Sequence, residues 1–500
     1  MHFTVPSRPN ERLCVPAIAE LVPAARANRR ALDGASASIG GVLLPELRAG
    51  LRRRVLELVK CAPDDERPVI AAGHQPGFPH PGILYKHAVL DQVAAEALCI
   101  NVIVDSDAAE VLSVKVPVRS KNGVALTELV MARTERGMVL GHAPKPERRA
   151  FEAQISEVRR AAAKLGSDEI LDGLDRFAAI HREEYPQYAT LAELLTAYRR
   201  RYFTTPHVHE VPLRALCETD EFRTFVTALL EDAPAFCTMH NAALAEHRRA
   251  RRIRTSANPF PDLRRDAHRT EVPLWHIDES GRRSPVYVGR SGKRTTVYAH
   301  DTAVGSFTTR AQLDRLLMGL ALRPRAQTLS IFLRLCASDL FIHGVGGANY
   351  DAATDAMVRA YFGVEPPSYA VASATVRLPL EFNDDLEQRC RDLAYRARRL
   401  TWNPDEFVPK SNPLRQQKAR ILQAAGERLT RQEHEGIESI RTQLLEAVAR
   451  QRLENDAALD EARAALTDQR RLASRDFPYF LYPLPRLVAA MHEPQATTTG

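Results

Sequence analysis

The fold is decided by the stretch RPVIAAGHQPGFPHPGILYKHAVL (residues 67–90), in which a short apolar run meets a crowded turn and then a helix. The helix is expected over 81–98, because its apolar residues recur at spacings of three and four. A second apolar run, CINVIVDSD (residues 99–107), follows and reads as a buried strand. Strand, helix and strand in this order form a βαβ unit, whose two strands are neighbours in a parallel sheet.

The rest of the chain extends this pattern in three ways. Helices are expected over 147–202 and 220–252, and the alternation of residues 271–301 predicts a small antiparallel insertion with a turn at SGK. A further parallel strand is expected over 339–347, where it ends in glycines, and a helix is expected over 350–363. Between Ile437 and Phe477 there is no glycine or proline and a thin apolar seam persists, which favours a long helical hairpin or coiled coil.

Composition excludes several classes of protein. Lysine and arginine number 69 against 62 acidic residues, and the net charge of +7 suits anionic partners without choosing among them. The seven cysteines lie far apart with no CxxC spacing, which argues against a disulfide scaffold and a cysteine zinc site and favours the cytoplasm. No signal peptide or membrane span is expected. Nucleic acid is disfavoured because the basic run 248–254 has no interleaved aromatic residues.

Two strand-to-helix turns share one design, in which an apolar strand ends in histidine and glycine before a helix. The turns are GHQPG, with Gly73 and Gly77, and HGVGGANYD, with Gly344, Gly346 and Gly347. In an open parallel sheet, ligands bind outside the carboxyl ends of the strands, where helix N-termini offer free N–H groups to anions. We therefore expect the two turns to form one cleft, although neither matches a standard phosphate-binding fingerprint.

Charged residues near these turns are further candidates. Asp105, Asp107 and Glu110 follow the second strand, where carboxylates could hold a cation, bind an amine or ribose, or act as a general base. Arg323 and Arg325 precede a buried-looking segment, where a guanidinium group suits a carboxylate or phosphate. The alternatives are that the acidic residues cap the next element and that the arginines form surface ion pairs.

These landmarks resemble, in order along the chain, those of the cysteine-adding enzymes of bacillithiol biosynthesis. The first turn of that family reads like T-G-Q-Q-x-G before a Leu-Tyr-x-x-Tyr-Lys helix, its second strand ends in an E-D-H-D-like stretch, and R-P-x-x-Q and a glycine-rich strand end follow. The matching residues here are Gly73, His74, Gln75, Gly77, Tyr85 and Lys86, then Asp105 and Asp107, then Arg323, Pro324 and Gln327, and finally Gly346 and Gly347.

The resemblance implies a mixed α/β fold with a Rossmann-like parallel sheet core, connecting insertions and a C-terminal helical coiled coil that forms a homodimer. The expected segments are 1–150 and 311–408 for the two parts of the core, 151–310 for the helical and antiparallel insertions, 409–476 for the coiled-coil helices, and 477–500 for a tail. The implied reaction is the ligation of cysteine to a glucosaminyl-malate precursor, an anionic sugar conjugate, in the synthesis of a low-molecular-weight thiol.

The predicted site follows from the turns and the resemblance together. The expected catalytic residues are His74, Asp105 and Asp107, one of which would take the proton from the attacking amine. The expected substrate- or nucleotide-binding residues are Gly73, Gln75, Gly77, His80, Tyr85, Lys86, Glu110, Arg323, Arg325, Gln327, His343, Gly344, Gly346, Gly347, Asn349, Tyr350 and Asp351. No metal site is predicted. No cofactor is assigned, because a phosphate loop is not present, and ATP or ADP is the candidate nucleotide.

Two alternatives stay open. Ser106 stands where the family has a histidine, and no glutamate follows Gly346 and Gly347, which favours a binding or scaffold protein that kept the fold without the chemistry. The first turn is also similar to the H-Q-P-x-x-x-P-x-x-G turn of WbqC-like proteins, which are linked to surface-polysaccharide metabolism.

Overall fold

The protein divides into two compact units, each of which is made of segments that are not contiguous in the sequence. The computed structural model describes residues 2–121, 123–255, 258, 260–425 and 428–492. The first unit comprises residues 1–116, 128–378 and 475–500, and the second comprises residues 117–127 and 379–474. The predicted core segment 311–408 therefore extends too far, because residues 379–408 pack with the helices of the second unit. Residues 493–500 of the predicted tail lie outside the described residues.

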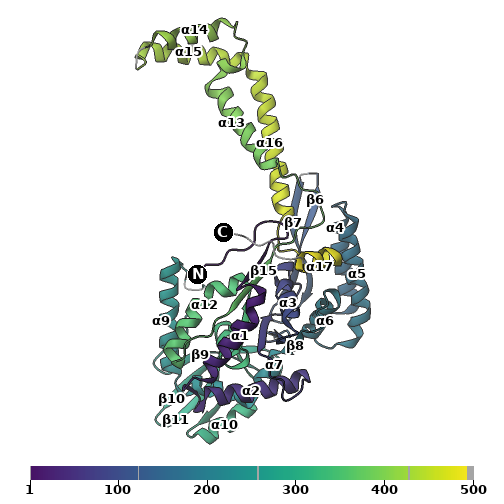
Figure 1. Cartoon of the computed structure of the whole chain (residues 1–500), viewed down its shortest axis with the longest axis vertical. Coiled ribbons are helices and arrows are strands. Elements are labelled where there is room, and N and C mark those ends of the chain that lie inside the picture. The colour runs from purple at the N-terminus through teal and green to yellow at the C-terminus, as the bar shows by residue number, and fades with distance from the viewer. Residues whose placement is uncertain (1, 122, 256–257, 259, 426–427, 493–500) are drawn as a thin grey trace. The chain divides into compact units, whose positions relative to one another are not determined.

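A six-stranded sheet organises the first unit (Figure 1). Its spatial order is β1-β15-β14-β4-β5-β8, in which β1 pairs antiparallel with β15 and the other neighbours are parallel. Numbered along the chain, the five parallel strands have the order 3-2-1-4-5 from β8 to β15, the order of a doubly wound Rossmann-type sheet. The strands are β1 (Arg12–Val15), β4 (Val69–His74), β5 (Leu98–Ile103), β8 (His209–Pro212), β14 (Leu340–His343) and β15 (Ala370–Ala374).

Helices cover both faces of this sheet, as the apolar sequence of its strands requires. The side chains of Val69 and Ala71 share a core with α2 and α8, whereas α3 contacts β4, β5 and β15. The predicted βαβ unit is confirmed, and its helix ends at Val93, five residues earlier than expected. The helices of this layer are α1 (Ile18–Asp33), α2 (Leu44–Val59), α3 (Pro81–Val93), α7 (Leu213–Cys217), α8 (Asp220–Glu231), α9 (Ala233–Arg251), α11 (Ala326–Phe332) and α12 (Val345–Met357).

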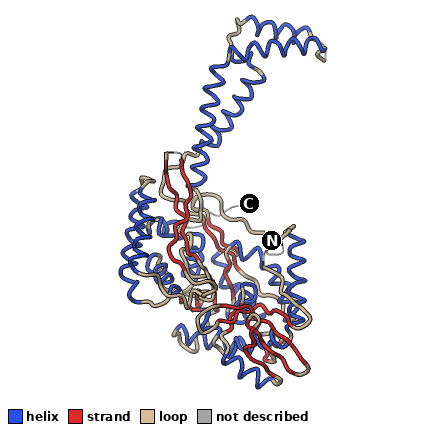
Figure 2. Tube along the Cα trace, turned by 180° about the vertical axis from the view of Figure 1, so that it is seen from behind, coloured by secondary structure: helices blue, strands red, loops and turns tan. Residues whose placement is uncertain are grey.

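The segment between the two halves of the sheet contains the expected helices and a confirmed antiparallel sheet (Figure 2). Three helices come first: α4 (Arg148–Ala163), α5 (Asp168–Glu184) and α6 (Leu191–Tyr202). The antiparallel sheet has the order β12-β11-β10-β9-β13, and Gly292 and Lys293 form its two-residue turn. Its strands are β9 (Arg269–Ile277), β10 (Arg283–Ser291), β11 (Arg294–Ala299), β12 (Thr302–Phe307) and β13 (Leu322–Pro324), and α10 (Arg310–Gly319) connects the last two.

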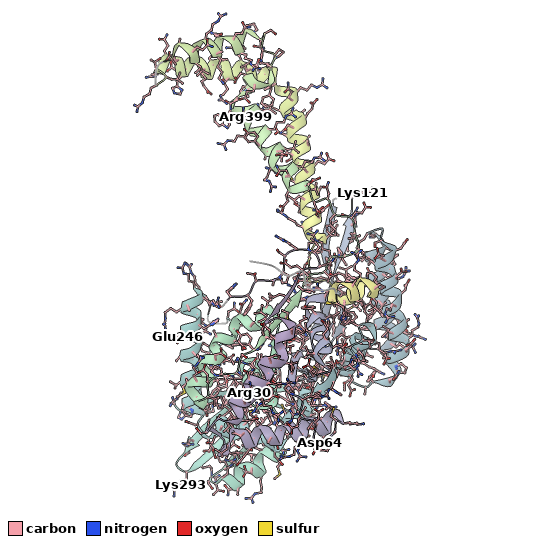
Figure 3. All side chains as sticks on the ribbon, viewed as in Figure 1. Arg30, Asp64, Lys121, Glu246, Lys293 and Arg399 are labelled. Carbon is pink, nitrogen blue, oxygen red and sulfur yellow. The ribbon has the colours of Figure 1, made fainter. Side chains whose placement is uncertain are left out.

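The remaining strands form two β-hairpins. They are β2 (Ser38–Ile39) with β3 (Val42–Leu43), and β6 (Val111–Ser120) with β7 (Gly123–Arg133). Charged side chains lie on the outside of the first unit, where Arg30, Asp64, Glu246 and Lys293 are exposed (Figure 3). This exposed charge is the ordinary state of basic and acidic residues in a folded chain.

The glycines of the second turn lie differently from the prediction. The helix expected over 350–363 begins at Val345, so that Gly346 and Gly347 belong to the first turn of α12. Gly344 is the N-cap, and no side chain caps this helix. Glycine lowers the propensity for helix, which is why the sequence placed the helix start after the glycines.

The second unit consists largely of paired helices. Its helices are α13 (Leu386–Trp402), α14 (Pro413–Ala424), α15 (Arg431–Ala447) and α16 (Ala449–Leu472), of which α13 pairs with α16 and α14 pairs with α15. Asn455, a polar residue within the predicted seam, is buried and donates to the carbonyl oxygen of Leu393 at 3.0 Å. The seam of α16 thus packs on α13, which the sequence analysis had assigned to the core. A coiled coil and a homodimer stay predictions.

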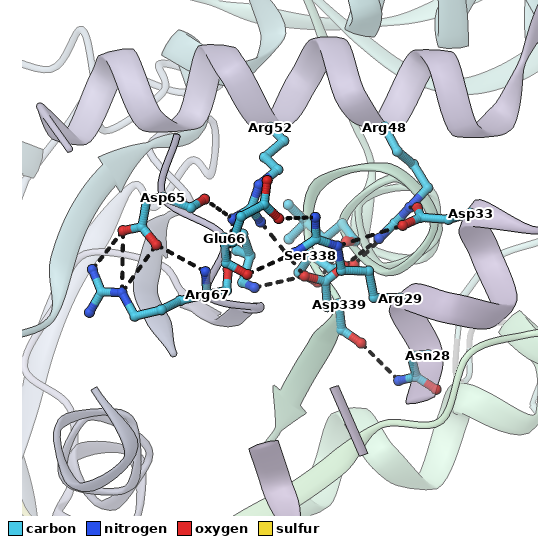
Figure 4. A network of polar contacts seen from close by, with 12 residues as sticks. Asn28, Arg29, Asp33, Arg48, Arg52, Asp65, Glu66, Arg67, Ser338 and Asp339 are labelled. Carbon is cyan, nitrogen blue, oxygen red and sulfur yellow. Dashed lines mark hydrogen bonds and ion pairs between the residues drawn. The ribbon is translucent and has the colours of Figure 1, made fainter. Parts of the chain in front are cut away.

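The edge of the sheet at the amino ends of β4 and β14 is held by a polar network (Figure 4). Asp339, which is 4% exposed, pairs with Arg48 and accepts from the backbone N–H of Val69 at 2.8 Å. Asn28 of α1 donates to the carbonyl oxygen of Asp339 at 2.8 Å. The network therefore joins α1, α2, β4 and β14. It lies at the amino ends of these strands, opposite the carboxyl ends at which a ligand would bind.

The aromatic segment near the C-terminus packs on other parts of the first unit. Phe480 stacks on Phe177 with ring centroids 4.4 Å apart and contacts Phe78, in the first turn, at 5.6 Å. The backbone N–H of Tyr479 donates to the carbonyl oxygen of Pro79 at 3.0 Å. The segment continues as a short 3-10 turn, η5 (Tyr479–Leu481), and α17 (Leu484–His492). Among the described residues, no helix is both long enough and apolar enough to cross a membrane.

Candidate functional site

One cavity lies where the order of the parallel strands reverses. His74 ends β4 and His343 ends β14. These two strands are parallel neighbours, and the order of the strands along the chain reverses between them. A cavity of about 630 Å³ opens at their carboxyl ends, where doubly wound proteins bind ligands. Both predicted turns line it, together with residues of β9, β10 and α11 and the segment at Arg475 and Asp476.

His74 faces this cavity as a neutral ring. Its Nδ1 atom lies 2.8 Å from the carbonyl oxygen of Gln75, so Nδ1 carries the proton and Nε2 is left as a hydrogen-bond acceptor. Burial, with a further contribution from Lys86, lowers the pKa of His74 to about 3. At neutral pH the ring is therefore a weak base, and it is better suited to orienting a donor than to removing its proton.

His80 is the N-cap of α3, and its ring has the tautomer opposite to that of His74. Its Nδ1 atom accepts from the backbone N–H of Gly82 at 3.1 Å and caps the helix, so the proton of the neutral ring lies on Nε2. Burial, followed by the charge of Arg475, lowers the pKa of His80 to about 4. The two histidines of the first turn thus provide one acceptor and one donor.

Lys86 is the buried cation of the cavity. It lies one turn into α3, is 4% exposed and donates to the carbonyl oxygen of Gly73 at 2.8 Å. Burial lowers its pKa to about 8. Among the residues that the structure describes, no carboxylate lies within ion-pair distance of Lys86, so two of its three donors are available to a ligand.

Arg475 brings a second cation to the start of α3. Its Nη2 atom donates to the hydroxyl of Ser373 at 2.8 Å, and its buried Nη1 atom has no hydrogen-bond partner within the described part of the chain. A Cβ atom on Gly82 would lie 2.0 Å from Nη2 of Arg475 and 2.6 Å from the carbonyl oxygen of Ala374. Only glycine at this position lets the guanidinium group approach the helix N-terminus.

In the second turn, the ring of His343 contacts a buried carboxylate that does not face the cavity. Nε2 of His343 lies 2.7 Å from a carboxylate oxygen of Asp351, and the same oxygen accepts from Arg334 at 2.8 Å. All three residues are at most 5% exposed. Burial opposes ionisation of Asp351, but His343 and Arg334 hold its pKa below the usual value. Asp351 therefore positions His343 and does not itself line the cavity.

The N-terminus of α12 is open to the cavity. Cβ atoms added to Gly344 or Gly346 would meet no atom within 4 Å, whereas one on Gly347 would lie 3.0 Å from Nδ1 of His343. Because no side chain in the described part of the chain caps α12, the first backbone N–H groups of this helix are available to receive an anion.

The wall opposite the two turns comes from the antiparallel sheet. Arg283 donates to Asp107 at 2.9 Å, and Arg325 donates to Glu271 at 2.7 Å. Their guanidinium carbons lie 4.7 Å and 4.1 Å from the ring centroid of Trp275. The lining contains four side-chain cations, Lys86, Arg283, Arg325 and Arg475, against the carboxylates of Asp107 and Asp476, so the cavity favours an anion.

The predicted site residues divide into three groups. Those that line the cavity are Gly73, His74, Gln75, His80, Lys86, Asp107, Arg325, His343, Gly344, Gly346 and Gly347. Those that line smaller hollows are Gly77, in a space of about 20 Å³, and Asp105, in a pocket of about 190 Å³. Those that line neither are Tyr85, Glu110, Arg323, Gln327, Asn349, Tyr350 and Asp351.

The residues of the third group have structural contacts of their own. Arg323 donates to the carbonyl oxygen of Leu322, Glu110 lies 3.7 Å from Arg136, and Asn349 binds the backbone of Phe3 through both amide atoms. The ring of Tyr350 contacts Phe260 at 5.9 Å. Tyr85 and Gln327 are buried in the core beside the cavity.

Four further residues line the cavity and were not predicted from the sequence; they are Trp275, Arg283, Arg475 and Asp476. The first two lie on neighbouring strands of the antiparallel sheet, and the last two precede the aromatic segment. The sequence carries a weak signal for Arg475 only, because a polar SRD run before the buried aromatic residues must end near the surface to which they dock.

Comparisons with known proteins add no family. No protein-family model and no curated protein matches the chain. A solved structure of tyrosyl-tRNA synthetase from Aeropyrum pernix aligns over 93% of this chain and 94% of that chain, at 10% sequence identity and a TM-score of 0.22. A similarity this weak carries no argument about this chain.

Proposed function

We propose that this protein is a ligase that joins cysteine to an anionic amino-sugar conjugate, glucosaminyl-malate, with the anionic group bound in the cavity between the two turns. The observation that carries the proposal is Lys86, a buried lysine that has no carboxylate partner among the described residues and lies in a cavity that three arginines also line. Burying an unpaired ammonium group is costly, and a bound anion would offset that cost. The open N-terminus of α12 adds backbone donors for a carboxylate or phosphate.

The arrangement of the resembling residues supports the same reading. Gly73, Lys86 and Asp107 come from one βαβ unit, and they line one cavity together with Gly346, which lies more than 200 residues further along the chain. The resemblance rests on these short segments, and their assembly around one space is what a shared binding site requires.

The chemistry of amide formation fits the two neutral histidines. The attacking amine must be neutral, and Nε2 of His74 can accept one of its N–H groups and orient it. The N–H of His80 and the ammonium group of Lys86 can stabilise the oxyanion that forms on the carboxyl carbon of the second substrate. Joining a carboxylate to an amine also needs an activated carboxylate, for which a nucleoside triphosphate is the candidate co-substrate. The carboxylate would take up a phosphoryl or nucleotidyl group, and attack by the amine would break the C–O bond to that group, release phosphate or the nucleoside monophosphate as leaving group, and pass the amine proton to the leaving group or to solvent.

The test is a reconstituted condensation of cysteine and glucosaminyl-malate with and without MgATP, followed by mass spectrometry of the thiol product. We expect product from the unaltered protein and a loss of at least about a hundredfold in rate with Lys86→Met. Lys145→Met is the matched control, because Lys145 also donates to a backbone carbonyl, that of Tyr185 at 2.7 Å, away from the cavity.

Two results would overturn the proposal. One is the absence of product in all nucleotide conditions while malate still binds in a manner that depends on Lys86, which would favour the binding-protein alternative. The other is unchanged activity of Lys86→Met. Thiol profiles of a strain that lacks the gene provide an independent readout, because the enzyme predicts a changed pool of cysteine-containing thiols.

A further inference from the structure

A second pocket, separate from the cavity, lies at the carboxyl ends of β5 and β8. It has a volume of about 190 Å³ and shares no lining residue with the cavity. Its lining combines Tyr188 with smaller apolar residues and with polar residues that include Asp105, Arg200 and Arg214; the smaller apolar residues are Ile103, Ala192, Ala197 and Pro212. The position at strand ends of a parallel sheet is a usual place for a ligand.

Asp105 is the inner charge of this pocket. The residue is 6% exposed, and its Oδ1 atom accepts from the backbone N–H of Arg214 at 3.2 Å. Its Oδ2 atom lies 3.7 Å from Nε of Arg214, which is an ion-pair distance but too long for a hydrogen bond. Burial raises the pKa of Asp105 to about 6, although the charges of Arg323 and Arg214 act in the opposite direction. This carboxylate is thus incompletely paired, and a cation in the pocket would stabilise its charged form.

The other carboxylates of the pocket are already engaged. Glu210 pairs with the buried Arg199 and accepts from Asn101 at 2.7 Å. Glu193 closes the capping box of α6 with Thr190. Asp105 is therefore the acidic group that remains for a ligand.

The outer charges of the pocket are positive. The side chain of Arg214 is 51% exposed, and Arg200 is also exposed. An incompletely paired carboxylate inside and guanidinium groups outside match a ligand with an ammonium group at one end and a carboxylate at the other. The small apolar walls leave room for a short side chain.

A narrow polar space separates the pocket from the cavity. This hollow of about 20 Å³ shares Ile103 and Thr196 with the pocket, and His74, Gln75 and Ile83 with the cavity. Three buried atoms in the residues that line it have no hydrogen-bond partner among the described residues; they are Nδ1 of His87, Oδ1 of Asn101 and Nη1 of Arg199. The pocket and the cavity therefore lie on the two sides of the first turn.

The structure assigns to this second pocket the binding of a small α-amino acid, with its ammonium group against Asp105 and its carboxylate toward Arg214 and Arg200. The assignment goes beyond the proposed ligase activity and does not depend on it, because the residues of the pocket are distinct from those of the cavity. The position of the pocket behind the first turn means that an occupant would contact the elements that hold His74.

The experiment is calorimetric titration of the full chain with alanine and with cysteine, compared with propionate, which lacks the ammonium group, and ethylamine, which lacks the carboxylate. We expect both amino acids to bind at least about tenfold more tightly than either fragment. Asp105→Asn should weaken alanine binding by at least about tenfold, since the amide keeps the backbone contact but loses the charge. Arg214→Gln should also weaken it, whereas Glu110→Gln, an exposed carboxylate outside the pocket, should not.

Three results would overturn the assignment. They are equal binding of alanine and propionate, unchanged alanine binding by Asp105→Asn, and loss of alanine binding in Lys86→Met, which would place the amino acid in the cavity. Circular dichroism of each variant separates lost binding from lost folding. If alanine binds as expected but the condensation assay gives no product, the ligase proposal fails while the pocket assignment stands.

Discussion

Nζ of Lys86 lies 2.8 Å from the carbonyl oxygen of Gly73, so a buried ammonium group is fixed to the last residues of the strand that enters the first turn. Gly73 and Lys86 lie on β4 and α3, the two elements that the turn connects. The lysine therefore ties the strand to the helix and keeps its remaining donors toward the cavity.

The first prediction concerns the pH dependence of anion binding. Burial lowers the pKa of Lys86 to about 8, so its charge is present below that pH and is lost above it. Malate should bind the unaltered protein more weakly at about pH 9 than at about pH 7, because His74 and His80 are already neutral over this range. Lys86→Met should weaken binding at the lower pH and remove most of the pH dependence. Titration calorimetry measures both, and an unchanged slope in the variant would contradict the role given to Lys86.

The second prediction compares two glycines. Gly82→Ala should destabilise the protein by about 1–3 kcal/mol and weaken malate binding, because the new methyl group meets Arg475 and the backbone of Ala374. Gly346→Ala should leave the free energy of unfolding within about 0.5 kcal/mol, since nothing lies within 4 Å of the added atom. It should still weaken malate binding, because the methyl group lies at the open start of α12. Urea unfolding and calorimetry distinguish the two, and equal stabilities would refute the close approach at Gly82.

The third prediction concerns the support of His343. Asp351→Asn removes the carboxylate that contacts both Arg334 and His343, and it should cost about 3–5 kcal/mol in the free energy of unfolding because a buried guanidinium group loses one of its two carboxylate partners. Glu365→Gln, which breaks the exposed pair with Arg359, is the control and should change stability little. Chemical denaturation of both variants provides the comparison. A small effect of Asp351→Asn would mean that Asp355, which also pairs with Arg334, is sufficient.

The fourth prediction uses the raised pKa of Asp105. Its folded-state pKa is about 6, against 3.8 for an aspartate outside a folded protein, so the native state binds more protons than the unfolded state between these pH values. The free energy of unfolding should therefore fall as the pH rises through this interval. Asp105→Asn should be more stable than the unaltered protein near neutral pH, by up to about 3 kcal/mol, and the difference should vanish below the lower pKa. Thermal unfolding at several pH values tests this, and a variant that is less stable at neutral pH would contradict it.

The sequence predicted which strands, turns and helices surround the site better than it predicted which residues line the site. The βαβ unit and the two turns could be predicted because apolar periodicity and glycine positions are local signals. Asp105 and Asp107 were both expected beside the first turn, because both follow the second strand of the βαβ unit. However, β5 ends at Ile103, and the N–H of Asp105 turns back to the carbonyl of Ile103 at 2.8 Å. The alternation is broken there, and the two carboxylates enter different pockets.

Long-range contributions could not be predicted in the same way. Arg283 and Arg475 reach the cavity from segments about 200 and 400 residues beyond the first turn, and nothing local marks them as ligand-binding. The start of α12 was misplaced because its glycines have low helix propensity, which the packing of the helix overrides. Whether the aligned helices of the second unit bring two chains together is a separate property that local patterning does not decide.

The contact between Phe78 and Phe480 has a consequence for biosynthesis. The first turn leaves the ribosome about 400 residues before the aromatic segment that packs on it, and Arg475 arrives with that segment. Until that segment has been made, the strand ends lack the residues that close the cavity. The candidate cavity is therefore completed only about 400 residues after the first turn.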